Sequence, residues 1–225
     1  MLLAIDTATR HASVALYDER GVAAEHTWSS RNRHSVEVLP AIAAMLSQQQ
    51  VTSQVLTSVA VTKGPGSFTG LRIGMSVAKG LALGLGIPIL AVPTLEVVVY
   101  AAGDPGMPVV AVLEAGRGRL CVGTYLFRDG LPEAQGDAAI VRAADWAPPA
   151  DVPLLLTGEV SAALVERLLA LPGCERIAVT TPAGCLRRAA YLAELAWGRM
   201  QQGAADDLDT LSPIYAHYPA SGDEA

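Results

Sequence analysis

The sequence lacks the closely spaced cysteines and histidines that hold metal ions in proteins. Its three cysteines are Cys121, Cys174 and Cys185, and its four histidines are His11, His26, His34 and His217. No two cysteines form a close pair, and no two histidines lie three to five positions apart, the spacing of ligands on one helix. We therefore expect no metal site. Because three cysteines cannot all pair internally, we expect free thiols, which are typical of a reducing cytoplasm.

Basic runs and long uninterrupted apolar runs are also absent. The formal net charge is −6, and without a basic run the chain is not expected to bind nucleic acid by itself, because that affinity depends largely on Lys and Arg. The most apolar region, residues 70–92, contains Arg72, Lys79 and Pro88, so it does not predict a membrane span. No basic segment followed by a long apolar one begins the sequence, so we expect no signal peptide. A cytoplasmic protein is predicted.

What is present favours a folded α/β protein, since 51% of the residues are hydrophobic and 17% are charged. Apolar runs and helical spacing predict the elements along the chain. Strands are expected at residues 2–6, 13–17, 58–62, 87–92, 154–158 and 177–180, and helices at residues 34–50, 68–86, 93–102, 161–171 and 186–202. Pro40 falls near the second turn of the first helix and predicts a late start or a kink there.

The pattern of the first half starts again in the second. A shift of about 108 positions sets Ala4-Ile5-Asp6 over Val112-Leu113-Glu114, and each acidic residue is followed by a small-residue turn and another strand. Any two hairpins share some of these features, but we favour two related α/β halves. The breakers of residues 103–108 suggest the linker. We expect an N-terminal subdomain at residues 1–103, a C-terminal subdomain at 104–205 and an acidic tail at 206–225, whose inner part is a candidate to pack onto the first subdomain.

A glycine-rich loop at residues 62–74 looks at first like a phosphate cradle. A Walker loop needs two glycines five positions apart followed by Lys and Ser or Thr, and neither Gly64 nor Gly66 meets that spacing. The dinucleotide pattern also fails, because Thr69 stands where its third glycine would lie. The loop therefore does not predict a nucleotide site.

The same glycines begin a row of small residues at every fourth position. The row consists of Gly66, Gly70, Gly74, Ala78, Ala82 and Gly86. On a helix this spacing forms one ridge against which another backbone can pack closely. Such a helix can be a core helix against a sheet, or it can be half core and half oligomer interface, and the sequence leaves both open.

Few residues suggest catalysis. Asp6 ends the first strand and is the best single candidate, although an aspartate there can equally accept hydrogen bonds from the turn at residues 7–10. Ser67 has no obvious base nearby. Cys121 lies in an apolar strand, where a packing role is the plainer explanation.

The loop Gly64-Pro65-Gly66-Ser67-Phe68-Thr69-Gly70, continued by Leu71-Arg72-Ile73-Gly74, resembles the signature of the TsaB family, formerly YeaZ, in the actin-like ATPase superfamily. Residues 5–9, 34–35, 39–40, 93–95 and 213–215 add weaker matches in the same order. The resemblance implies two related subdomains of the actin-like, ribonuclease H-like type, each a mixed sheet flanked by helices.

The resemblance also implies a function. TsaB-like proteins are non-catalytic partners of TsaD, with the ATPase TsaE as the third member. Together they transfer a threonylcarbamoyl group to N6 of the adenosine next to the anticodon, in tRNAs reading codons that begin with adenine. A TsaB-like subunit contacts TsaD through helices of its first half, can form a homodimer in isolation, needs no cofactor and meets tRNA only through the complex.

The nucleotide-binding elements of the superfamily are altered in this chain. The turn after Asp6 has no glycine and carries the bulky Arg10, and Glu159 stands where a second glycine would face the adenosine. The chain also departs from the TsaB pattern at Glu114-Ala115-Gly116 and at His217. We therefore expect no ATP binding. The alternative is a phosphotransferase of the sugar or acetate kinase type, with Asp6 as the base.

The predicted partner interface lies on the two long helices of the first half. Its residues are His34, Val38, Ile42 and Met45 on the first helix, and Phe68, Leu71, Arg72, Gly74, Met75, Ala78 and Lys79 on the second. Arg72, Met75 and Lys79 are expected on the partner-facing side.

Overall fold

A computed structural model describes residues 1–31, 33–149 and 152–215 of the chain. The described chain forms two compact units. Unit 1 contains residues 1–97 and 187–215, and unit 2 contains the described residues from 98 to 186.

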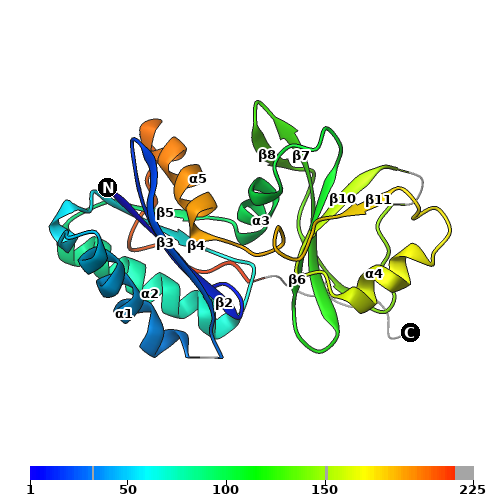
Figure 1. Cartoon of the computed structure of the whole chain (residues 1–225), viewed down its shortest axis with the longest axis horizontal. Helices are drawn as coiled ribbons and strands as arrows, with labels where there is room; N and C mark the ends of the chain where they lie inside the picture. The colour runs from blue at the N-terminus through cyan, green and yellow to red at the C-terminus, as the bar shows by residue number, and fades with distance from the viewer. Residues whose placement is uncertain (32, 150–151, 216–225) are drawn as a thin grey trace. The chain divides into compact units, whose positions relative to one another are not determined.

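Unit 1 is a five-stranded mixed sheet in the order β3-β2-β1-β4-β5, with helices on both faces (Figure 1). β1, β2 and β3 are antiparallel neighbours, while β1, β4 and β5 run parallel. The strands are β1 (Leu2–Asp6), β2 (His11–Asp18), β3 (Gly21–Ser29), β4 (Ser58–Thr62) and β5 (Ile89–Val92). The helices are α1 (His34–Gln48), the short η1 (Ser53–Val55), α2 (Phe68–Leu85) and α5 (Ala189–Gln201), while α3 (Thr94–Ala102) begins in unit 1 and ends in unit 2.

Two cores hold unit 1 together. α1 and α2 lie side by side on one face of the sheet (Figure 1). Val38, Ile42 and Met75 on these helices pack with apolar residues of the strands. α5 covers the other face with buried residues such as Leu192 and Ala196. β1 is buried along its whole length because both of its faces are covered, which explains its continuous apolar sequence.

Unit 2 repeats the five-strand order of unit 1 and adds β9 as a second partner of β7. Its order is β11-β10-β6-β7-β8, with β6 antiparallel to β7 and parallel to β10. The elements are β6 (Val109–Glu114), β7 (Arg119–Arg128), β8 (Leu131–Ala134), β9 (Ala139–Arg142), β10 (Leu154–Gly158), α4 (Ala162–Leu169) and β11 (Ile177–Val179). β1 and β6 therefore hold equivalent positions, which confirms the predicted repeat and the fold class.

Unit 1 differs from the sequence-based expectations in α1 and α5, and it contains β3, which was not expected. α1 begins at His34 and contains Pro40, so the late start is wrong. The last helix, α5, lies in unit 1 although the boundary at 205 assigns it to the second subdomain, because its apolar face covers β1 and β2.

The segment after α5 runs along unit 1. The Asp206 N–H donates to the Ile89 carbonyl (2.9 Å), its carboxylate accepts from the Ala91 N–H (2.7 Å), and the Ile214 N–H donates to the Lys63 carbonyl (2.6 Å). The described residues end at Tyr215, so His217 lies outside them.

Candidate functional site

The glycine loop packs against the turn that follows β1, residues 7–10, which we call the β1–β2 turn. A Cβ atom on Gly66 or Gly70 would lie within 3.0 Å of the carbonyl oxygens of Ala8 and Thr7, closer than real Cβ atoms approach such atoms. At Gly74 a Cβ would meet the Thr7 hydroxyl equally closely. The first half of the small-residue ridge therefore allows a turn, and not another helix, to lie directly on α2.

Hydrogen bonds close this contact. The Thr7 hydroxyl donates to the Gly70 carbonyl (2.7 Å), and the Ser67 N–H donates to the Ala8 carbonyl (2.6 Å). The Ser67 hydroxyl caps α2 by accepting from the Gly70 N–H (3.2 Å). These loop N–H groups are thus already bonded within the protein, so the backbone does not offer them to a phosphate.

The Asp6 carboxylate is enclosed by donors at the carboxyl end of β1. One oxygen accepts from the Ala8 N–H (2.9 Å) and from the Thr62 hydroxyl (3.1 Å), and the other accepts from Arg187 Nε. Asp6 is 1% exposed. A general base must reach a substrate proton, and this carboxylate is turned instead toward its own backbone and Arg187.

Arg187 is the central residue that sequence reasoning missed. It is 5% exposed, forms an ion pair with Asp6 and donates from Nη2 to the Thr9 hydroxyl (3.2 Å). The two partners lie 181 positions apart, and no spacing in the sequence links them. In the sequence it is one of two adjacent arginines at the start of an apolar helix, and this position does not identify a partner.

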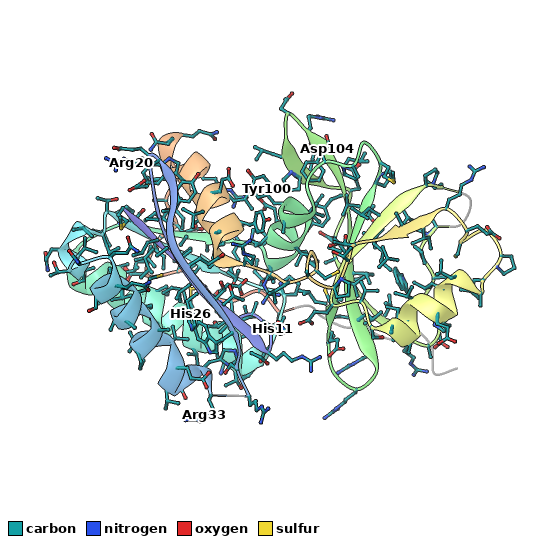
Figure 2. The ribbon with its side chains drawn as sticks, viewed as in Figure 1. His11, Arg20, His26, Arg33, Tyr100 and Asp104 are labelled. Atoms are coloured by element: carbon teal, nitrogen blue, oxygen red, sulfur yellow. The ribbon has the colours of Figure 1, made fainter. Side chains whose placement is uncertain are left out.

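His34 ties α1 to the same turn. It is 4% exposed, and its Nε2 lies 3.0 Å from the Thr9 carbonyl, to which that nitrogen donates. The β1–β2 turn is therefore fixed from α1, α2 and the segment before α5. Figure 2 shows His11 and Arg33 at this end of unit 1 and Arg20 at the opposite end, in the turn between β2 and β3.

The equivalent end of the unit 2 sheet is also occupied by a side chain. Glu159 follows β10, and its carboxylate accepts from the Glu114 N–H at the end of β6 (2.8 Å). The hairpin after β6 turns through Gly116, Arg117 and Gly118, all with positive φ. Its two glycines thus serve the tight turn to β7.

The predicted interface residues divide into two groups in the structure. Those in the core of unit 1 are His34, Val38, Ile42, Met45, Leu71, Gly74, Met75 and Ala78. Phe68 and Arg72 are exposed, and Lys79 is half-buried. Most of the predicted interface residues are therefore buried beneath the outer surface of α1 and α2 and are not exposed on it.

The outer surface of α1 and α2, which we call the helix face, exposes large apolar side chains. Val36 is 58% exposed, Leu39 51%, Phe68 55% and Leu83 73%. A groove of about 430 Å³ lies between the helices, lined by Ser35, Phe68, Thr69, Arg72, Ile73, Ser76 and Val77. A second groove of about 600 Å³ is lined by residues between Leu39 and Ser53 and by Leu81 of α2. Apolar side chains gathered on one surface are typical of a protein interface.

Other chemistry is sparse among the described residues. They contain no group of three His, Cys, Asp or Glu side chains placed to hold a metal ion. No helix among them has the length and apolarity to cross a membrane. Burial raises the pKa of the Cys121 thiol to about 11, so it is not a thiolate nucleophile at neutral pH.

Comparison with known proteins gives consistent results. A family model described as TsaD, tRNA N6-adenosine threonylcarbamoyltransferase, matches residues 19–148, which is more than half of the chain. The Bacillus subtilis protein named tRNA threonylcarbamoyladenosine biosynthesis protein TsaB is 37% identical over 145 residues, covering 64% of this chain and 63% of that protein. The Escherichia coli protein of that name is 36% identical over 126 residues, covering 55% and 54%. The chain thus spans less than two thirds of the length of these curated relatives.

Solved structures match over a larger share of the chain. YeaZ from Pseudomonas aeruginosa superposes with a TM-score of 0.80 at 29% identity, covering 95% of this chain and 98% of that one. A second structure, described as an uncharacterized protein with similarity to peptidase YEAZ from the same organism, gives a TM-score of 0.81 at 28% identity and covers 96% and 99%. The likeness therefore includes both units.

Proposed function

The chain belongs to the TsaB (YeaZ) family, and from this premise we propose that it is a non-catalytic scaffold subunit in the synthesis of threonylcarbamoyladenosine on tRNA. Its relatives are named for that biosynthesis. In this proposal the chain assembles with TsaD and TsaE in the cytoplasm. TsaD then transfers the threonylcarbamoyl group to N6 of the adenosine beside the anticodon in tRNAs that read codons beginning with adenine.

The observation that carries the non-catalytic role is the occupation of Asp6. Ala8, Thr62 and Arg187 of the chain itself donate to its carboxylate, and Arg187 covers the oxygen that the backbone leaves free. A phosphotransferase of the sugar or acetate kinase type would need Asp6 as an accessible base and a loop open to phosphate. The closed contact between the glycine loop and the β1–β2 turn supports neither requirement.

The helix face supports the scaffold role. It presents apolar side chains on two helices that are held at their N-terminal ends by the β1–β2 turn. We propose that TsaD docks on this face in a four-helix packing, and that the same face forms a homodimer when the chain is alone. The chain then contacts tRNA only as part of the assembled complex.

Co-purification tests this proposal. The chain should form a complex with TsaD of the same cell, and TsaE should join the assembly. Calorimetry of the isolated chain with ATP and magnesium should give no binding signal. Tight ATP binding by the isolated chain, or no association with TsaD, would contradict the scaffold role.

A further inference from the structure

The outer end of the helix face carries an arginine that is fixed in place but only partly paired. The Arg72 guanidinium carbon lies 3.8 Å from the centroid of the Phe68 ring, and Arg72 Nε donates to the Tyr215 hydroxyl (2.8 Å). The rings of Phe68 and Tyr215 are 5.1 Å apart, so the three side chains form one cluster, which we call the Arg72 cluster. No bond from the terminal nitrogens of Arg72 is found among the described residues.

The cluster holds the guanidinium ready for a further bond. Stacking on an aromatic ring and a hydrogen bond at Nε restrict the long side chain before any partner arrives, so less conformational entropy is lost on binding. Arg72 is an exposed residue and lines the same groove as Ser35, Ile73 and Ser76. Two adjacent N–H donors in one plane match the two oxygens of a carboxylate.

The helix face itself cannot supply that carboxylate. Glu37 is the only acidic residue in the sequences of α1 and α2. Its carboxylate already accepts from Trp28 Nε1 (2.9 Å) and lies 3.9 Å from Arg33 Nε. A second copy docked through the same face would add another Arg72 and no free acid, and like charges brought together oppose binding.

We propose that Arg72 is the specificity-determining anchor of the helix face, and that its partner is a protein helix that places an Asp or Glu carboxylate on the terminal nitrogens of Arg72. The inference rests on the proposed scaffold function, because it names the chemistry of the partner at that surface. The apolar grooves provide contact area for the partner helix. The stacked arginine selects an acidic partner over a second copy of this chain.

The test measures the affinity of purified Arg72 variants for TsaD. Arg72→Glu should weaken binding by at least about 30-fold, as expected for an interface hot spot. Arg72→Lys keeps the charge but loses the planar pair of donors, so it should lose part of the affinity. Arg176→Glu is the matched control, since Arg176 is exposed in unit 2 and the change in net charge is the same; its affinity should stay within about twofold of wild type.

Two further measurements test the role of Tyr215 and whether a second copy of the chain occupies the helix face. Tyr215→Phe removes the acceptor for Arg72 Nε but keeps the ring, so it should weaken binding less than Arg72→Glu does. Self-association of the isolated chain should not weaken in Arg72→Glu, whereas loss of a dimer in that variant would make the second copy the occupant and overturn the inference.

The inference and the function on which it rests fail in different ways. If wild type binds TsaD and Arg72→Glu binds as well as Arg176→Glu does, Arg72 is not the anchor, and the proposed scaffold role is unaffected. If wild type does not bind TsaD, both are wrong. Unchanged thermal unfolding of Arg72→Glu, an exposed position, shows that lost binding is not lost folding.

Discussion

The ion pair between Arg187 and Asp6 occupies the carboxyl end of β1. An aspartate at the carboxyl end of a first parallel strand lies where α/β folds commonly bind ligands. Here the guanidinium occupies its outer oxygen, and Thr9 binds the same guanidinium. A position suited to chemistry is thereby used to join the segment before α5 to the β1–β2 turn.

Removal of Arg187 should therefore destabilise the protein strongly. Arg187→Ala leaves a buried, unpaired carboxylate and should lower the free energy of unfolding by about 3–5 kcal/mol. Arg128→Ala is the control, because the side chains of its pair with Glu133 are 74% and 48% exposed; it should cost less than about 1 kcal/mol. Urea unfolding of both variants measures the difference, and equal small losses would show that the buried pair is not important for stability.

Glu37 makes stability depend on pH at acid values. The hydrogen bond from Trp28 lowers the pKa of this carboxyl below its ordinary value, with a further bond from Ser30 acting in the same direction. A lowered folded pKa means that the stabilisation is present above about pH 4.3, the ordinary value, and is lost as the pH falls through the folded pKa.

The variant Glu37→Gln measures that effect. Its loss of stability relative to wild type should be present at pH 7 and should shrink steadily below about pH 4. Thermal unfolding across this range measures the change. A difference between the two proteins that stays constant with pH would show that the carboxylate is not bonded as described.

At the scale of elements, α2 shows what its sequence could and could not predict. The small-residue ridge was predicted from spacing alone, and the structure shows close packing at Gly66, Gly70 and Gly74. The surface against which it packs was not predictable. α2 is apolar on nearly all sides, so periodicity could not orient it, and residues such as Leu71 and Met75 placed on the predicted partner face lie in the core.

Two glycines of α2 should respond in opposite ways to alanine. Gly74→Ala forces a methyl group onto the Thr7 hydroxyl and should destabilise by about 1–3 kcal/mol. Gly80 has open space around it, so Gly80→Ala should stabilise the helix by about 0.5–1 kcal/mol. Denaturant midpoints of the two variants measure this contrast, and stabilisation in both would contradict the close contact between α2 and the β1–β2 turn.

At the scale of the whole molecule, the duplication was the feature best predicted by the sequence. β1 and β6 align at the predicted shift, and each lies third in its strand order, between an antiparallel and a parallel neighbour. The course of the chain after residue 186 was harder to predict. α5 returns to unit 1 because its apolar face covers the sheet formed by the first half of the chain, where Ser13 of β2 lies 176 positions before Ala189, and no local pattern signals such a distant pairing.

In both units a side chain of the protein itself bonds at the end of the central strand. In unit 1 the end of β1 is covered by Arg187, and in unit 2 the end of β6 is bonded to Glu159. The helix face exposes Val36, Leu39, Phe68 and Leu83, although large apolar side chains such as Leu131 and Leu169 are also exposed elsewhere. This distribution favours a molecule that works through its surface on another protein.

Threonylcarbamoyl transfer to tRNA in a reconstituted system tests that account most directly. The chain alone, given the threonylcarbamoyl adenylate, ATP and tRNA, should form no modified adenosine, and a mixture of TsaD and TsaE should become active as the chain is added, up to a fixed stoichiometry. Modification of tRNA or steady ATP hydrolysis by the chain alone, or full activity of TsaD and TsaE without it, would contradict the account.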